Sequence, residues 1–206
     1  MRIFKTPRFL QLVFKRRTWG FSHTQNSVFL TFDDGPNPEI TPWVLDQLKM
    51  HQVKATFFCV GENVQKYPAI FERILAEGHA VGNHSMRHEN ALKTKPSTYL
   101  KSVYQTATLI DSSLFRPPYG RLTPILAKKI RKDFQIVMWT WLSYDFDRKV
   151  TIDAIVERAQ REIKAGDILV LHDNAKIADR QKELLPRIID VLHDKKLISE
   201  VLTSNE

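Results

Sequence analysis

The chain has 206 residues, a net charge of +8 and a hydrophobic content of 43%. This length and composition exclude a disordered or low-complexity chain, and they favour one domain with one sizeable core. The excess of Lys and Arg favours anionic surroundings, such as a membrane surface, an acidic glycan or a nucleic acid. Because no nucleic-acid-binding motif accompanies the scattered basic residues, we expect no nucleic-acid partner.

The N-terminal segment, residues 1–26, is basic and partly apolar, and we predict that it forms an arm preceding a single domain at residues 27–206. Its apolar stretch FLQLVF is interrupted by Gln11 and is too short for a signal-peptide core or a membrane span. We expect a short helix or arm that packs on the domain, with peripheral contact to an anionic membrane or wall as the alternative. We expect a monomer, cytoplasmic or at a membrane surface rather than secreted.

From residue 27 onward, apolar strand-like runs alternate with helical stretches. In chain order we predict strand 27–32, helix 41–50, strand 55–60, helix 62–76, strand 79–82, helix 97–110, a strand from 114, helix 124–132, strand 134–139, helix 151–164, strand 167–172, helix 180–193 and strand 198–202. Pro42 suits the first turn of its helix and Thr151 suits an N-cap. Repeated units with near-continuous apolar strands predict a parallel sheet covered by helices.

Polar residues follow the predicted strands where they end. They are Asp33 and Asp34 after the first strand, His84 and His88 after the third, Arg116 and Tyr119 after the fourth, Asp145 after the fifth, and His172 and Asp173 at the end of the sixth. An open, doubly wound sheet would bring together only the loops near its crevice, whereas a barrel brings all of them to one face. We therefore predict an α/β fold that forms an incomplete (β/α) barrel with about seven parallel strands.

The adjacent acids in TFDDG, Asp33 and Asp34, have two ordinary explanations. Asp before Gly-Pro is good turn chemistry, and Asp is also a good helix N-cap. Each explanation accounts for one acid, but two neighbouring carboxylates raise the cost of ionising each other. Such a pair indicates a cation or a proton that the two groups share.

The segment HSMRH places His84 and His88 four residues apart. On a helical turn these positions share a face, so both imidazoles can reach one ion. Such a pair is weak evidence alone, but Asp34 can supply a third ligand. Three protein ligands with an open position are typical of catalytic zinc and also of non-haem iron, so the residues leave the metal open.

The remaining polar residues fit proton transfer around such a metal. Asp33 can take a proton from a water that the metal activates, and His172 can protonate a leaving group. Asp145 can hold the His172 ring and favour its charged form, and Arg116 can keep Asp33 ionised. The alternatives are that Arg116 forms a surface ion pair and that His172 is an ordinary strand-end histidine.

Five segments resemble, in order, the five motifs of the polysaccharide deacetylases, which form carbohydrate esterase family 4. They are TFDDG (31–35), HSMRH (84–88), RPPYG (116–120), WTWLSYDF (139–146) and LVLHD (169–173). The resemblance runs from about Ser27 to Leu202. It implies a distorted (β/α) barrel and the metal-dependent removal of N-acetyl, sometimes O-acetyl, groups from sugars.

The resemblance also implies a role for each matching residue. Asp33 is the general base and Arg116 orients it; the backbone N–H of Tyr119 stabilises the oxyanion; His172 is the general acid and Asp145 tunes it. The implied metal ligands are Asp34, His84 and His88. Zn²⁺ is the usual ion, and another divalent metal can serve.

The fourth motif departs from the family pattern. Leu142 and Phe146 stand where the family often has Asp and Trp, and Val170 replaces a Leu in the fifth motif. The departures bear on substrate choice more than on chemistry. We expect an N-acetylglucosamine-containing glycan or oligosaccharide as substrate, with a lipid-linked or O-acetylated sugar as the alternative. A non-catalytic glycan-binding barrel is the second alternative, although such a module needs no proton donor.

Overall fold

Eight short parallel strands lie at the centre of the computed structural model, which describes residues 2–22 and 24–204. The strands are β1 (Ser27–Asp33), β2 (Thr56–Cys59), β3 (Ala80–Asn83), β4 (Leu114–Phe115), β5 (Gln135–Ile136), β6 (Trp141–Leu142), β7 (Ile168–His172) and β8 (Ile198–Ser199). Seven of them follow the order β5-β4-β3-β2-β1-β7-β6, and β8 pairs separately with the start of β1. The predicted fold class, an incomplete barrel of about seven parallel strands, is confirmed.

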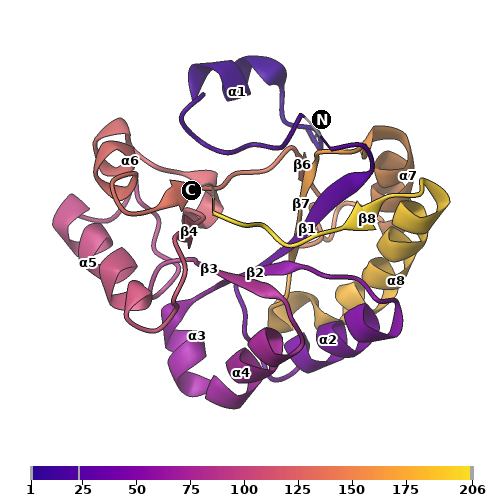
Figure 1. Ribbon diagram of the computed structural model, residues 1–206, viewed down its shortest axis with the longest axis horizontal. Coiled ribbons are helices and arrows are strands. Elements are labelled where there is room, and N and C mark those ends of the chain that lie inside the picture. The colour runs from indigo at the N-terminus through magenta and orange to yellow at the C-terminus, as the bar shows by residue number, and fades with distance from the viewer. Residues whose placement is uncertain (1, 23, 205–206) are drawn as a thin grey trace.

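Helices surround the strands (Figure 1). They are α2 (Thr41–Met50), α3 (Gly61–Lys66), α4 (Pro68–Ala76), α5 (Pro96–Ala107), α6 (Pro124–Ile130), α7 (Ile152–Glu162) and α8 (Ala178–Asp194), with 3₁₀ turns η1 (Pro118–Gly120) and η2 (Ala175–Ile177). All seven residues of β1 are buried, as expected for a central strand covered on both faces. Thr151 caps α7 as predicted, because its Oγ1 accepts a hydrogen bond from Ala154 N at 3.2 Å.

The N-terminal arm lies along the open side of the barrel. Within the described residues β5 and β6 do not pair with each other, and the arm bonds to both edges. Lys5 bridges Trp141 in antiparallel fashion, and Thr18 bridges Val137 in parallel fashion. Between these bridges the chain forms α1 (Arg8–Val13), which stands outside the ring of helices in Figure 1. The domain boundary between residues 26 and 27 remains a prediction.

Several predicted elements were wrong in extent: the strand predicted at 198–202 is Ile198–Ser199, and the helix predicted at 97–110 ends at Ala107. Two further differences have a visible cause. The helix predicted at 62–76 is two helices, because Pro68 lacks an N–H and starts a new helix at its first turn. The strand predicted at 134–139 ends at Ile136. Beyond it Met138 N donates to Thr18 O at 2.7 Å, so the backbone there pairs with the N-terminal arm. The chain then crosses the gap to β6, which the sequence did not predict. Among the described residues, no helix combines the length and apolarity needed to cross a bilayer.

Candidate active site

A cleft of about 750 Å³ opens at the carboxyl ends of the strands. Its lining residues are Asp33, Asp34, His84, His88, Asn90, Lys93, Tyr119, Gly120, Arg121, Trp139, Leu142, Phe146, Val170, His172, Asn174 and Lys176. Two further predicted site residues, Arg116 and Asp145, are fully buried and bond to residues that line the cleft. The barrel therefore brings together residues that lie more than a hundred positions apart in the sequence.

Asp34, His84 and His88 form a cluster whose ligand atoms all lie within 4.8 Å of one another. The Oδ1 atom of Asp34 lies 3.1 Å from His88 Nε2 and 3.7 Å from His84 Nε2. This oxygen is buried and has no hydrogen-bond partner, while Oδ2 accepts a bond from Asn174 Nδ2 at 2.8 Å. A buried carboxylate oxygen without a partner is costly, so the cluster fits a bound cation.

His84 is held in the form that a metal ligand requires. Its Nδ1 lies 2.7 Å from the carbonyl oxygen of Arg116, which assigns the proton to Nδ1 and leaves the Nε2 lone pair toward Asp34. Burial lowers the pKa of His84 to about 4, so the ring is neutral at pH 7. A neutral imidazole with a fixed tautomer is a suitable ligand for a divalent metal.

The predicted helical turn at HSMRH was wrong, although the two imidazoles do converge. The segment after β3 is an irregular loop in which Ser85 and His88 have φ values of 63° and 55°. Positive φ is uncommon for residues other than glycine and breaks helical geometry. Glu89 stabilises the loop, because its Oε2 accepts hydrogen bonds from Ser85 Oγ at 2.8 Å and Ser102 Oγ at 2.7 Å.

Asp33 is paired with Arg116 inside the barrel. Arg116 is 0% exposed, so the alternative of a surface ion pair is excluded. Its Nη1 donates to Asp33 Oδ1 at 2.7 Å and to Thr31 Oγ1 at 2.6 Å, and its Nη2 donates to Met138 O at 3.1 Å. The guanidinium also lies 4.0 Å from the centre of the Phe58 ring. This arrangement holds the Asp33 carboxylate in a fixed position beside the Arg116 cation.

His172 is paired with Asp145. The ring Nδ1 lies 2.7 Å from Asp145 Oδ1, and the backbone N–H of His172 donates to Asp145 Oδ2 at 2.8 Å. Gln181 Nε2 also donates to Oδ2, at 3.1 Å. Burial alone would lower the pKa of His172, but the charge and hydrogen bond of Asp145 outweigh it and raise that pKa to about 10. The imidazole is therefore held in its charged, proton-donating form.

Asp173 fixes the loop that carries the two adjacent acids, a role that the sequence did not reveal. Its Oδ1 accepts a hydrogen bond from Gly35 N at 3.0 Å, and its Oδ2 accepts one from Thr41 Oγ1 at 2.5 Å. A Cβ on Gly35 would lie 2.1 Å from Asp173 Oδ2, so any other residue there would force the carboxylate to move. The sequence shows Asp173 directly after His172, but it does not show the partners of Asp173, because they lie in distant parts of the chain.

Aromatic and apolar side chains form the walls of the cleft. The Tyr119 ring lies 4.5 Å from the His88 ring, and Phe146 meets His172 edge-on with ring centres 5.2 Å apart. Leu142 and Val170 complete the wall beside them. The two departures in the fourth motif, Leu142 and Phe146, therefore both face the space that a substrate would occupy.

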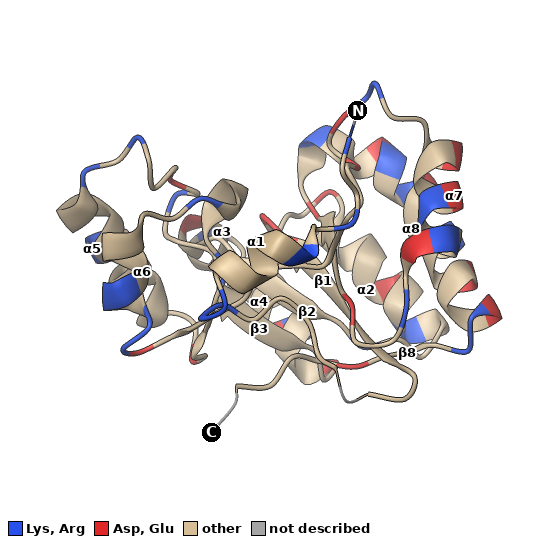
Figure 2. Ribbon diagram, turned by 90° about the horizontal axis from the view of Figure 1, so that it is seen from above, with Lys and Arg blue, Asp and Glu red and all other residues tan. Residues whose placement is uncertain are grey.

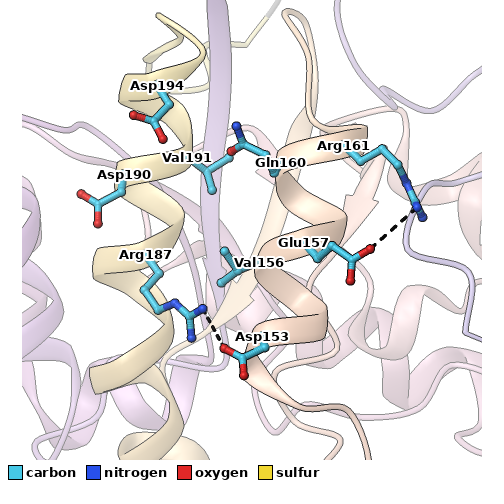
Figure 3. A pocket seen from close by; sticks show the side chains of 9 residues that line it. All are labelled: Asp153, Val156, Glu157, Gln160, Arg161, Arg187, Asp190, Val191 and Asp194. Atoms are coloured by element: carbon cyan, nitrogen blue, oxygen red, sulfur yellow. Dashed lines mark ion pairs between the residues drawn. The ribbon is translucent and has the colours of Figure 1, made fainter.

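A second cavity, of about 650 Å³, lies in the groove between α7 and α8 (Figure 3). Arg187 Nη2 pairs with Asp153 Oδ1 across the groove at 2.8 Å, and Arg161 pairs with Glu157 along α7 at 3.9 Å. The groove's acids form no metal-ligand cluster; in the described part of the chain, the group of Asp34, His84 and His88 is the one found. In the described residues, the cluster that could hold a metal therefore lies at the barrel mouth.

Parallel barrels carry their chemistry at the carboxyl ends of the strands, and this mouth combines an Asp/His/His cluster with an Arg-paired carboxylate and an Asp-paired histidine. That combination is typical of barrel enzymes that are hydrolases. The chain belongs to the polysaccharide deacetylase family, because the family model described as "Polysaccharide deacetylase" matches residues 22–138.

Curated relatives and solved structures agree with this assignment. A peptidoglycan-N-acetylglucosamine deacetylase from Bacillus cereus is 36% identical over 77% of the chain and 60% of the relative's length. A chitooligosaccharide deacetylase from Bradyrhizobium is 38% identical over 80% of the chain and 78% of the relative. The crystal structure of the Bc1960 peptidoglycan N-acetylglucosamine deacetylase superposes with a TM-score of 0.86 at 32% identity, covering 96% of this chain and 95% of the other.

Proposed function

We propose that this chain is a metal-dependent hydrolase that removes N-acetyl groups from an N-acetylglucosamine-containing glycan or oligosaccharide. One observation carries the proposal: a single cleft contains a ligand cluster with an unpartnered carboxylate oxygen, an Arg-paired carboxylate and a histidine whose pKa is raised. The named relatives act on N-acetylated glycans, which supports the substrate class.

The chain's own residues account for both proton transfers of amide hydrolysis. Asp33 takes a proton from water as the water oxygen bonds to the acetyl carbonyl carbon, and Arg116 holds the carboxylate in place. His172 gives its proton to the sugar nitrogen as the C–N bond breaks. The products are acetate and the free amine. A divalent metal, when bound, polarises the acetyl carbonyl and increases the acidity of water.

We propose Zn²⁺ as the metal, held by Asp34, His84 and His88. One carboxylate and two imidazoles with an open position suit catalytic zinc, and other divalent ions fit the same donors. We expect metal analysis of protein purified without chelator to find about one ion per chain.

The rim of the cleft favours a negatively charged glycan. Lys93, Arg121 and Lys176 are exposed and line the cleft, and none pairs with an acid in the described structure. The two acids that line the cleft, Asp33 and Asp34, are those assigned to the general base and the metal. Peptidoglycan fragments with peptide carboxylates therefore suit this rim better than neutral chitin oligomers.

A panel of substrates tests the proposal. Acetate and free amine are measured in parallel for chitin oligomers, peptidoglycan fragments, lipid-linked N-acetyl sugars and O-acetylated sugars, with and without added zinc. We expect equal amounts of acetate and amine, and faster turnover of the carboxylate-bearing fragments. The variant Lys93→Gln/Arg121→Gln/Lys176→Gln should lose that preference and keep its rate on neutral oligomers.

The panel also decides between catalysis and binding. Saturable glycan binding without release of acetate from any member would identify a non-catalytic barrel instead. Acetate without amine would identify an O-deacetylase. We further propose that the chain acts as a monomer, without a nucleic-acid partner, and in contact with an anionic surface.

A further inference from the structure

Helix α1 presents large apolar side chains to solvent. None of its residues is buried, and Phe9, Leu12 and Val13 are 63%, 74% and 67% exposed. Neighbouring α6 adds Ile125, which is 67% exposed. Scattered single apolar side chains are normal on a protein surface, but a group on one short element indicates an interaction site.

This helix is held in position by the barrel and not by its own stability. Six residues are too few for a stable isolated helix. On one side Thr6 N donates to Thr140 O at 2.8 Å, and on the other Thr18 N donates to Ile136 O at 2.8 Å. The two anchors fix α1 outside the barrel wall, so its apolar side chains are presented on a rigid support.

Cations lie next to these apolar side chains. A groove of about 420 Å³ between the arm and α6 is lined by Val13, Phe14, Lys15, Arg16, Arg17, Pro124, Ala127, Lys128 and Arg131, with no acid among them. Figure 2 shows Lys and Arg but no Asp or Glu on α1 and α6. Within the described residues, the cations Arg8, Lys15, Arg16, Lys128 and Arg131 form no ion pair with an acid.

We propose that this surface, the apolar residues Phe9, Leu12 and Val13 with the neighbouring cations Arg8, Lys15, Arg16, Lys128 and Arg131, docks on an anionic phospholipid membrane. The apolar side chains enter the boundary between headgroups and acyl chains, and the cations meet the lipid phosphates. Charge complementarity favours this occupant, because the surface combines exposed apolar groups with positive charges that pair with no described acid.

Docking would place the side of the barrel that carries the arm against the membrane. The arm that carries α1 also bonds to the cleft wall, since Leu142 N donates to Phe4 O at 2.9 Å. None of the residues of the docking surface lines the cleft, so membrane binding and hydrolysis use separate residues. Membrane binding can therefore be measured whether or not the proposed activity is correct.

Co-sedimentation with vesicles tests the proposal. The full chain is mixed with phosphatidylcholine vesicles or with vesicles containing equal parts of phosphatidylcholine and phosphatidylglycerol. We expect binding to the anionic vesicles alone, weakened by added salt. Leu12→Ser/Val13→Ser and Lys15→Gln/Arg16→Gln/Lys128→Gln should each weaken binding by about tenfold or more.

Matched variants control for general loss of apolarity or charge. Met50→Ser/Leu75→Ser removes exposed apolar side chains elsewhere, and Lys49→Gln/Lys101→Gln/Lys182→Gln removes as many exposed charges. Both should bind anionic vesicles like the wild type, and all four variants should keep wild-type activity on a soluble glycan.

Three results would overturn the proposal. The first is that the chain binds neutral and anionic vesicles equally well. The second is that both docking-surface variants bind anionic vesicles as the wild type does. The third is that the chain binds isolated peptidoglycan through α1 and does not bind vesicles. Self-association of the wild type that Leu12→Ser/Val13→Ser abolishes, measured by sedimentation velocity, would assign the surface to a second copy of the chain and overturn it as well.

Discussion

Asp145 accepts two hydrogen bonds from His172, one from the ring Nδ1–H at 2.7 Å and one from the backbone N–H at 2.8 Å. The carboxylate thus fixes both the charge and the position of the histidine. This relationship remains although Leu142 replaces the acid that the family often has three residues earlier. The fourth motif therefore retains its link to proton donation while changing the cleft wall.

The first prediction concerns the pH dependence of activity. Burial lowers the pKa of His172, but Asp145, with smaller contributions from Asp34 and Asp33, raises it from 6.5 to about 10, and the protonated ring is the donor that we propose. We expect kcat/KM to fall as pH rises through that pKa. Asp145→Asn removes the charge, so the basic limb of the pH profile should move to lower pH and the maximal rate should drop. The acidic limb should move much less.

Leu142→Asp is the matched change in the same motif. Because Leu142 lines the cleft and the His172 ring bonds to Asp145 instead, this variant should alter substrate preference more than the basic limb. A basic limb that stays in place in Asp145→Asn, while His172→Ala is inactive, would mean that another group tunes the histidine.

The second prediction concerns Arg116. The variant Arg116→Met leaves the buried carboxylate of Asp33 without its cation. Loss of one partner of a buried ion pair typically lowers the free energy of unfolding by about 3–5 kcal/mol. Arg148→Met, which breaks an exposed pair with Asp179, should cost much less, because water and salt screen the pair. Urea unfolding of both variants checks the difference. Equal losses of unfolding free energy in the two variants would indicate that the buried pair stabilises the fold no more than the exposed pair does.

The third prediction concerns the contact between Gly35 and Asp173. Gly35→Ala should destabilise the fold by about 1–3 kcal/mol, because its Cβ would overlap the Asp173 carboxylate. Asp173→Ala should cost a similar amount, because the buried Gly35 N–H loses its acceptor. The double variant should cost less than the sum of the two, since removing the carboxylate also removes the overlap. Additive losses would contradict this account.

The sequence predicted the convergence of the site better than its local structure. Polar residues at the ends of buried strands were sufficient to bring Asp33, His84 and His172 to one mouth, because parallel strands of a barrel end on the same side. The helical turn at HSMRH failed because spacing does not reveal a positive φ at Ser85 and His88. Such conformations depend on side-chain acceptors supplied by other segments.

The supporting contacts of the site were not predictable for a related reason. Glu89 holds the loop that carries His84 and His88, and Gln181 holds the pair of His172 and Asp145. Both act through bonds to residues that become neighbours only in the folded chain. The split of helix 62–76 had a visible cause in Pro68 and could have been predicted. The end of β5 could not, because it depends on where the N-terminal arm pairs.

The fourth prediction separates the two adjacent acids, Asp33 and Asp34. Asp33→Asn should keep the metal and lose about 10²–10⁴-fold in activity, because an amide cannot accept the proton from water. Asp34→Asn should weaken metal binding, because it removes the charged ligand whose Oδ1 lies beside both imidazoles. His84→Ala/His88→Ala should abolish metal binding.

Metal content and acetate release, measured on the same preparations of wild type, Asp33→Asn and Asp34→Asn, test the central claim most directly. The account predicts a metal-loaded, nearly inactive Asp33→Asn protein and a metal-poor Asp34→Asn protein whose activity partly returns with excess zinc. Equal metal affinity in the two variants, or wild-type acetate release by Asp33→Asn, would contradict the division of one carboxylate for the cation and the other for the proton.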